Sequence, residues 1–547
     1  MTCSPTARTA SRRHGPRQQG RRRSAIVAAA IGLGLAVLAG ACSSGRSSSS
    51  GAPGTSPTSA VGVAGSSRHP DIVFILTDDL SWNLITPEIA PHIVELERRG
   101  ETFDHYVVAD SLCCPSRSTI FTGLYPHDTH VVTNLPPDGG YSKFRSEHLD
   151  TRTYAAALHD AGYRTSMLGK YLNGYGTKNG DDHAGQAMTP TGAPVPPGWT
   201  DWHVSNNTGY AEYDFLLNDN GTINRYTGDD DYGVDVINRD TQSFITANHD
   251  APFVVEAATF APHAPYTPAT RNADDFPGLT EPRDPSFDAQ NVDPPTWLGQ
   301  RPPLRPKQVD TIDASYRKRA QAVESVDKLL ADTEATLAEE HLTDDTYIVF
   351  SSDNGYHLGQ HRLARGKQTA FDTDIRVPLI VAGPGVPHAA TMHQVVQNTD
   401  LAPTIEQLAG VTGPAAVDGT SIEPLLHPRT TTPWWPTVAL VEHQGGDSST
   451  DPDFEGGGSN PTTYEAIRIS AAHLPGFTGP VEATYVEYAD PQHELEFYDL
   501  ATDPYELTNA AAQLTAAQRT ELHEVLTHLV GCHTAATCTS ARRPSGS

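Results

Sequence analysis

Two pairs of oxygen-bearing side chains have the composition of a metal site. They are Asp78 with Asp79 and Asp353 with Asn354, and each pair directly follows a short apolar run. In open α/β sheets, ligands bind beyond the carboxyl ends of the strands. Carboxylate and amide oxygens are the ligands that Ca²⁺ and Mg²⁺ prefer. The pattern therefore favours a hard-cation site, although Asp and Asn after a strand also commonly form turns or helix caps.

The segments that would carry these residues alternate between strands and helices. A continuous apolar run predicts a buried strand at 72–76, and a second buried strand is expected at 253–257. Further strands are expected at 164–168, 347–350 and 378–382. Helical spacing of apolar residues predicts helices at 89–96, 153–160, 323–337 and 401–409. This alternation predicts an α/β fold, with a large, mostly parallel mixed sheet covered by helices on both faces. The Pro/Asp/Gly-rich segments 176–240 and 267–312 are expected to be long excursions from that sheet.

The sequence changes character after about residue 430. Short strands are expected at 438–441, 466–469, 483–488 and 494–498, followed by a helix at 516–529. We expect a small antiparallel sheet with a C-terminal helix here. The predicted organisation is a main α/β domain at 70–430, this subdomain at 431–531 and a tail at 532–547.

The N-terminus has the organisation of an export signal. Residues 1–41 contain seven arginines and no acid, and they end in the apolar run 25–41. Leu38-Ala39-Gly40-Ala41-Cys42 resembles a bacterial lipobox, which implies a lipid on Cys42. The alternatives are that the segment stays uncleaved as a membrane anchor, or that it is cleaved and leaves Cys42 without a lipid. With the Ser/Gly-rich tether 42–69, this predicts a lipoprotein outside the cytoplasmic membrane, or a secreted protein.

Charge and cysteine usage narrow the function further. The 547 residues include 38 Lys plus Arg against 66 Asp plus Glu, which argues against a nucleic-acid binder. An anionic substrate would therefore need locally placed cations or a metal. Cys532 and Cys538 could close a small disulfide loop in an oxidising compartment. Cys113 and Cys114 are adjacent, are unsuited to pairing with each other, and need another explanation.

The explanation comes from the motif Cys113-Cys114-Pro115-Ser116-Arg117, which is followed by Thr122-Gly123. It resembles the C-x-P-S-R signature of the formylglycine-dependent sulfatases, which have an alkaline-phosphatase-like fold. In that family, the formylglycine-generating enzyme oxidises the first cysteine to Cα-formylglycine, whose hydrate is the nucleophile. The resemblance implies that Cys113 is modified and that Cys114 fills the variable position.

Further motifs occur in the family's order over about residues 70–530. The catalytic residues implied are Cys113, Arg117, Lys170, His263 and Lys367. The metal ligands implied are Asp78, Asp79, Cys113, Asp353 and Asn354, with Ca²⁺ expected and Mg²⁺ as the alternative. In such a site the lysines would neutralise the sulfate, and His263, with Lys367, would protonate the departing alcohol.

Within the family, the segments 113–117, 170–173 and 353–357 are most similar to the N-acetylglucosamine-6-sulfatase branch. This implies a sulfated carbohydrate as substrate, with 6-O-sulfate on a glucosamine-type sugar. Leu172 stands where arylsulfatases usually have a histidine, so the motif does not identify the base that releases sulfate. The candidate substitutes or substrate contacts are Asn173, His127, His130 and His357, each of which could equally be a surface or structural residue.

Two other functions fit parts of the sequence. Phosphonate monoester hydrolases and phosphodiesterases of the same superfamily can share the nucleophile and a related metal site. A non-catalytic, glycan-binding lipoprotein would also fit the signal, the tether and the acidic body. Comparing the turnover of sulfate and phosphate esters distinguishes a sulfatase from the phosphorus-ester hydrolases. An unmodified Cys113 in the mature protein would favour the glycan-binding lipoprotein.

Overall fold

The computed structural model describes residues 69–177, 188, 193–299, 301–414, 416–427, 434–445 and 461–543. The export signal, Cys42 and the tether up to residue 68 lie outside these residues. Of the helices in the described ranges, none combines the length and hydropathy needed to cross a bilayer.

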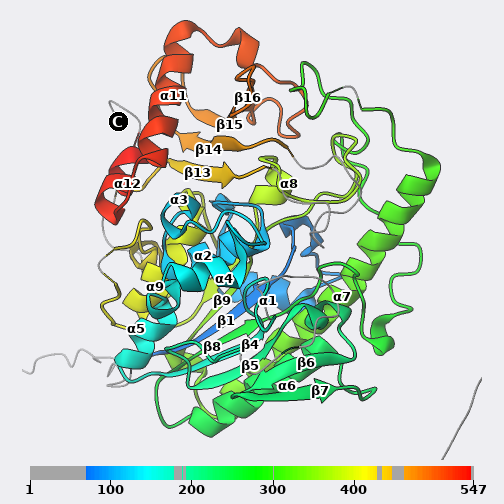
Figure 1. Cartoon of the computed structure of the whole chain (residues 1–547), viewed down its shortest axis with the longest axis vertical. Coiled ribbons are helices and arrows are strands. Elements are labelled where there is room, and N and C mark those ends of the chain that lie inside the picture. The colour runs from blue at the N-terminus through cyan, green and yellow to red at the C-terminus, as the bar shows by residue number, and fades with distance from the viewer. Residues whose placement is uncertain are drawn as a thin grey trace, which may run out of the picture. The chain divides into compact units, whose positions relative to one another are not determined.

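A ten-stranded sheet forms the centre of the fold, in the order β11-β2-β10-β9-β1-β8-β4-β5-β6-β7 (Figure 1). Its parallel centre consists of β9 (Thr346–Ser352), β1 (Asp71–Thr77), β8 (Phe253–Ala258), β4 (Arg164–Lys170) and β5 (Asp201–Ser205). Antiparallel pairs are added by β10 (Leu379–Ala382), β2 (Glu101–Phe103), β6 (Phe215–Asp219) and β7 (Thr222–Tyr226). The strand β11 (Ala390–Met392) pairs in parallel with β2, and β3 (Tyr106–Val107) forms a separate pair with β12 (Val396–Gln397). The predicted mixed, mostly parallel sheet is confirmed.

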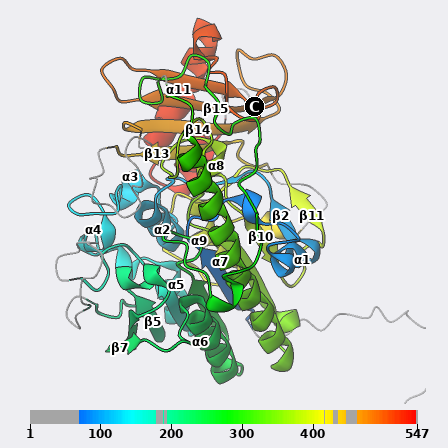
Figure 2. The ribbon, with the colours of Figure 1, turned by 90° about the vertical axis from the view of Figure 1, so that its right-hand side faces the viewer.

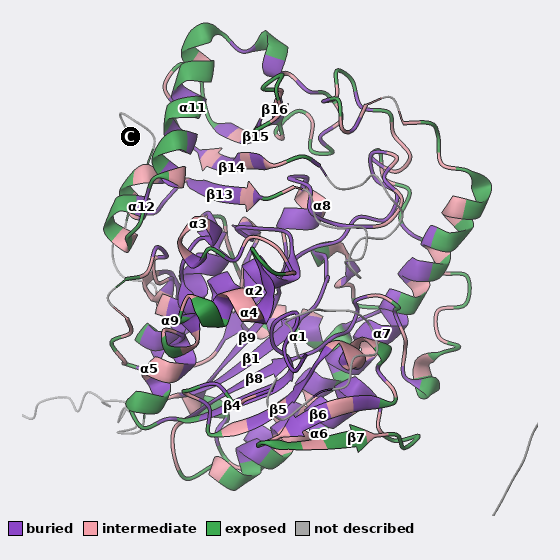
Figure 3. Ribbon diagram, viewed as in Figure 1, coloured by how far each residue is buried: buried purple, intermediate pink, exposed green. Residues whose placement is uncertain are grey.

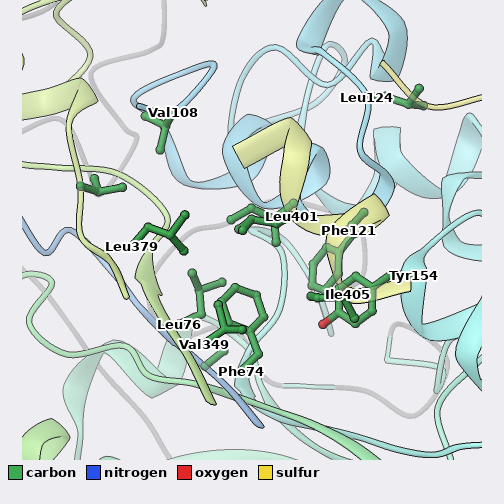
Figure 4. Packing of buried hydrophobic residues seen from close by; sticks show 14 of the residues in the cluster. Phe74, Leu76, Val108, Phe121, Leu124, Tyr154, Val349, Leu379, Leu401 and Ile405 are labelled. Carbon is green, nitrogen blue, oxygen red and sulfur yellow. The ribbon is translucent and has the colours of Figure 1, made fainter. Parts of the chain in front are cut away.

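Alternate side chains of β1 enter two hydrophobic layers, because successive residues of a strand point to opposite faces. Phe74 and Leu76 pack toward Phe121, Leu401 and Ile405 (Figure 4). That layer is covered by α2 (Cys113–Thr122), α4 (Gly140–Ser146), α5 (Tyr154–Asp160) and α9 (Leu401–Leu408). The other layer is covered by α1 (Pro91–Arg99), α6 (Gly233–Asn248) and α7 (Pro306–Glu339), of which α6 and α7 lie side by side (Figure 2).

A four-stranded antiparallel sheet follows, as the sequence predicts. It contains β13 (Val438–His443), β14 (Tyr464–Ala471), β15 (Val481–Tyr488) and β16 (Leu495–Asp499). The helix α11 (Ala516–Val530) packs on it through Leu522, Leu526 and Leu529 and exposes its outer side to solvent (Figure 3). Three short helices, α3 (Pro126–Thr129), α8 (Asp372–Ile375) and α10 (Glu423–Leu426), lie in connecting segments. The boundaries at 430 and 431 stay predictions, because 428–433 lies outside the described residues.

The expectation for the segment 176–240 was wrong. Instead of leaving the sheet, its described part supplies β5, β6, β7 and the first turns of α6. These strands lie at one side of the sheet, and β7 is its edge, with mostly exposed residues (Figure 3). Edge strands carry polar residues because only one side of their backbone pairs, so the expected apolar run is missing. For the segment 267–312 the expectation holds over 267–305, whose described residues contain no strand or α-helix, but it is wrong for 306–312, which form the first turns of α7.

The C-terminal segment 532–547 also has more structure than a tail. The predicted pairing of Cys532 with Cys538 is confirmed, and α12 (Ala535–Ala541) includes the second of these cysteines. Arg542 is fully buried and donates to Asp400, with 3.1 Å between Nη1 and Oδ1. A buried ion pair of this kind fixes the end of the chain to the main sheet's helical layer. Asp400 thus serves this contact and does not cap α9 with its side chain.

A buried carboxyl in β8 predicts how stability depends on pH. Burial raises the pKa of Glu256 from 4.5 to about 7, and the Tyr154 hydroxyl donates a hydrogen bond to it. The carboxyl therefore stays protonated in the folded chain up to about pH 7, while in the unfolded chain it ionises above about pH 4.5. The stabilisation that the protonated Glu256 gives to the folded chain is complete below about pH 4.5 and is lost as pH rises through 7. We expect Glu256→Gln to reduce the fall in unfolding free energy between pH 5 and 8 by on the order of 1–3 kcal/mol, measured by urea denaturation. An unchanged slope would contradict this assignment.

Candidate active site

The site residues meet at one edge of the main sheet because the parallel strands end in register. Thr77 of β1 pairs with Ser352 of β9, so Asp78 and Asp353 begin the two loops that follow. In the same way, Gly169 of β4 pairs with Ala258 of β8. Lys170 therefore ends β4 at the same edge, close to the loop that carries His263. The sequence-based prediction that the two acidic pairs share one edge agrees with this register.

The two adjacent cysteines have different surroundings. Cys113 begins α2, and its Sγ lies 3.4 Å from Oδ1 of Asp78 and 2.9 Å from Nζ of Lys367. Cys114 belongs instead to the hydrophobic layer beneath the helix, and its backbone N–H donates to Oδ1 of Asn134 at 2.9 Å. Only Cys113 thus faces the charged groups, which is the orientation that a nucleophile needs.

The carboxylates and the amide provide oxygen donors suited to a hard cation. Ligand atoms of Asp78, Asp79, Cys113 and His263 all lie within 4.8 Å of one another. Oδ2 of Asp79 and Oδ1 of Asn354 are buried and accept no hydrogen bond from the described residues. Buried oxygens of this kind are costly unless something compensates them. The donor set therefore fits Ca²⁺ or Mg²⁺.

Asp353 has a different environment from the other carboxylates. Its Oδ2 accepts from Nε of Arg117 at 2.7 Å. Its Oδ1 accepts from the backbone N–H groups of Asp79 and Asn354 at 3.2 and 2.8 Å. Asp353 thus accepts a hydrogen bond from Asp79 but is not one of the four residues Asp78, Asp79, Cys113 and His263 whose ligand atoms converge. It also fixes the loop that carries Asn354.

Two lysines place positive charge against these carboxylates. Lys170 forms an ion pair with Asp78, and Nζ of Lys367 lies 2.7 Å from Oδ1 of Asp79. Burial alone would lower the pKa of Lys170, but Asp78 and Cys113 outweigh it and the pKa is raised. The pKa of Arg117 is likewise raised, because Asp353 and Asp78 outweigh its burial. These cations remain charged within an otherwise acidic chain.

His263 is oriented so that one ring nitrogen faces the carboxylates. Its Nδ1 lies 2.7 Å from the carbonyl oxygen of Ala264, which can only accept, so Nδ1 donates. Nε2 lies 3.6 Å from Oδ2 of Asp79. Nε2 is therefore the atom that can gain or lose a proton next to bound substrate.

Two candidate functional residues were not predicted from the sequence. Tyr210, from the 3₁₀ turn Asn207–Ala211, contacts the rings of His263 and Phe260. Arg319 of α7 is fully buried and donates to the backbone carbonyl of Asp79 and, at 3.3 Å, to that of Pro262. Nothing in the sequence marked Tyr210. Arg319 had a signal, because it is a charged residue on the apolar face of the helix, three residues after Tyr316.

The candidate substrate contacts fall into two groups. Asn173 donates to the Tyr210 hydroxyl at 3.4 Å and lines the same small pocket as Lys170. His127 instead contacts Glu442 at 2.9 Å through Nδ1 and the Cys532 carbonyl at 2.8 Å through Nε2, which leaves no ring nitrogen for a substrate.

The remaining histidines have other partners. His130 is an exposed residue whose Nδ1 lies 3.4 Å from Glu147. His357 is buried, and its Nδ1 lies 3.0 Å from Asp374. Its hydrogen bonds are made within its own loop region, so it does not share the contacts of the Cys113 cluster.

The arrangement defines a class of site: buried carboxylates, two lysines, an arginine, a histidine and a cysteine gathered at the carboxyl edge of an α/β sheet. The family model for sulfatases matches residues 70–411. Human N-acetylglucosamine-6-sulfatase is 32% identical over 474 residues, which are 82% of this chain and 82% of the human protein. The chain therefore belongs to the sulfatase family and is a sulfuric ester hydrolase.

Solved structures agree in fold. A protein solved in complex with its substrate D-glucosamine-2-N,6-O-disulfate superimposes with a TM-score of 0.66 at 20% identity, over 84% of this chain and 97% of that one. The phosphonate monoester hydrolase of Agrobacterium radiobacter gives 0.62 at 19% identity, over 84% and 95%. The similar scores show that the fold does not distinguish sulfate from phosphonate esters.

Proposed function

We propose that this protein is an exported sulfatase that removes 6-O-sulfate from glucosamine-type sugars of sulfated glycans. The observation that carries the proposal is the placement of Cys113, whose Sγ contacts Lys367 and Asp78 while Cys114 is turned into the core. The substrate class is supported by the 32% identity to human N-acetylglucosamine-6-sulfatase over most of both chains. Export, and lipid attachment at Cys42, rest on the N-terminal sequence.

Two groups would complete the site. Cα-formylglycine, made from Cys113 by the formylglycine-generating enzyme, would supply a hydrated aldehyde as nucleophile. A divalent cation, Ca²⁺ or alternatively Mg²⁺, would supply Lewis acidity and positive charge. Asp78, Asp79, Asn354 and Asp353 would hold it, the last mainly by fixing its neighbours.

The chain's own side chains would bind the sulfate and set its orientation. A sulfate ester carries its charge on nonbridging oxygens, and charge builds on the bridging oxygen as the S–O bond breaks. Lys170 and Lys367 are buried cations on either side of Cys113, so they would neutralise the nonbridging oxygens. Their ion pairs with Asp78 and Asp79 keep both ammonium groups in place before substrate arrives.

Arg117 and His263 would have distinct tasks. Arg117 is fully buried, and its Nε and Nη1 donate to Asp353 and to the carbonyl of Lys170. It would therefore position β4 and the Asp353 loop without touching substrate. His263 would give the proton on Nε2 to the departing alcohol oxygen, because Nδ1 is committed to Ala264.

The test is a substrate screen on purified, Cys113-matured protein. We expect N-acetylglucosamine 6-sulfate and glucosamine 6-sulfate to be hydrolysed with a kcat/KM at least about 10²-fold above that for phosphate diesters and phosphonate monoesters. Galactose 6-sulfate, galactosamine 6-sulfate and an aryl sulfate complete the panel. A preference for the phosphorus esters would identify a phosphonate monoester hydrolase or phosphodiesterase instead. Binding of sulfated sugars without turnover by matured protein would indicate a glycan-binding lipoprotein.

A further inference from the structure

We infer that Tyr210 is a specificity-determining residue, whose ring is the surface on which the sugar of the leaving group packs. The inference rests on the proposed function, because it concerns the alcohol released from the same site. It is carried by the closeness of one aromatic ring to two groups of the cluster. The ring centroid lies 4.5 Å from that of His263 and 5.0 Å from Nζ of Lys170.

Exposure distinguishes Tyr210 from its neighbours. Lys170, Asn173, Phe260 and His263 are all buried, whereas Tyr210 is only half-buried. The partly open ring thus belongs to the wall of the site that an incoming molecule can touch. The same pocket is lined by Asn173 and Asn207, whose amides suit the hydroxyl or amide groups of a sugar.

Contacts with Phe260 and Asn173 hold the Tyr210 ring in place. Its edge-to-face contact with Phe260 has a centroid distance of 4.9 Å and an interplanar angle of 73°. Gly209 permits this approach, because a Cβ at that position would lie 2.3 Å from the Phe260 ring. The Tyr210 hydroxyl accepts a hydrogen bond from Asn173 at 3.4 Å. These contacts make a rigid platform rather than a mobile side chain.

The proximity to His263 identifies what packs there. Nε2 of His263 would protonate the oxygen that leaves with the sugar, so the attached carbon must lie within a few ångströms of that ring. A ring in contact with His263 is then next to the carbon skeleton of the alcohol. The apolar C–H face of a pyranose is the surface that packs on an aromatic ring, and its hydroxyls remain available to amides.

The experiment compares Tyr210→Ala and Tyr210→Leu with Tyr210→Phe, using the sugar 6-sulfate that wild type hydrolyses fastest. We expect the first two variants to raise KM about tenfold while kcat stays within about threefold. Tyr210→Phe keeps the ring and loses only the weak hydrogen bond from Asn173, so its KM should stay within about threefold of wild type. Calorimetric titration of the unsulfated sugar should show the same tenfold loss. Affinity for inorganic sulfate, which reports on the Lys170 and Lys367 end of the site, should be unchanged in every variant.

Three results would overturn the inference. The first is unchanged KM and sugar affinity in Tyr210→Ala. The second is a loss that falls on kcat and the pH profile alone, which would make Tyr210 a support for His263. The third is a parallel loss of sulfate affinity. A wild type that hydrolyses phosphorus esters but no sugar sulfate would overturn the proposed function as well, and the wild-type screen alone reveals that case.

Discussion

Replacement of Cys113 by serine is expected to abolish hydrolysis of sulfate esters, with kcat lowered by about 10³-fold or more. A serine at this position offers one hydroxyl on its β-carbon. Once sulfated, that carbon has no second hydroxyl from which electrons can move to expel sulfate, so the enzyme would be trapped after one turnover. Steady-state turnover of the best sugar 6-sulfate measures the loss.

The same protein allows the modification to be located directly. Conversion of a thiol side chain to an aldehyde lowers the mass by about 18 Da. Peptide mapping of active wild-type protein should place that loss on Cys113 and leave Cys114 as a thiol. Material purified without the maturation enzyme should lack the mass change and the activity together.

Cys114→Ala provides the matched control, because the two cysteines differ in contacts and not in burial. Cys114 packs in the hydrophobic layer, so its loss removes one small buried group and should cost about 1–2 kcal/mol of stability. Turnover should stay within about threefold of wild type. If Cys114→Ala has no turnover while Cys113→Ser turns over substrate as wild type does, the nucleophile is assigned to the wrong cysteine.

The sequence predicted the centre of the fold well, and the reason is physical. β1, β8 and β9 are buried on both faces, so their sequences are mostly apolar, with Glu256 of β8 as an exception. The polar residues that follow β1 and β9 mark the sheet edge. Sequence patterns alone are therefore sufficient to place Asp78 and Asp353 at one edge of the sheet. The C-terminal sheet was also predicted, because its strands are short, mostly buried segments separated by turns.

The strands and the site residue that were not predicted lack such sequence patterns. β7 is a solvated edge strand, where the sequence need not be apolar, and β6 beside it has only a short apolar segment, Phe215 to Leu217. Tyr210 functions through its distance to Lys170 and His263, which are far away in sequence and are brought near by β4 and β8. Pairwise proximity of this kind depends on the complete topology. Single-residue patterns could not have supplied it.

The second large effect concerns the cation. Asp79→Asn should lower Ca²⁺ affinity about 100-fold or more and reduce activity in parallel. The substitution keeps the shape of the side chain but removes a charge, and Oδ2 of Asp79 is a buried oxygen that accepts no hydrogen bond from the described residues. Asp353→Ala would be a poorer probe, because it would strand the buried Arg117 without its carboxylate and cost about 3–5 kcal/mol of stability.

Linkage between binding and folding provides a readout that does not depend on turnover. Ca²⁺ at 100 times its Kd should stabilise wild type by about 2.7 kcal/mol, visible as a rise in Tm, whereas Asp79→Asn should not respond at that concentration. Asp327→Asn is the control: Asp327 is a buried aspartate that accepts from the N–H groups of His92 and Ile93, remote from the cluster. It should lose stability and keep the full Ca²⁺ response. If Asp79→Asn binds Ca²⁺ as tightly as wild type, Asp79 is not a ligand, and its charge serves only to hold Lys367 beside Cys113.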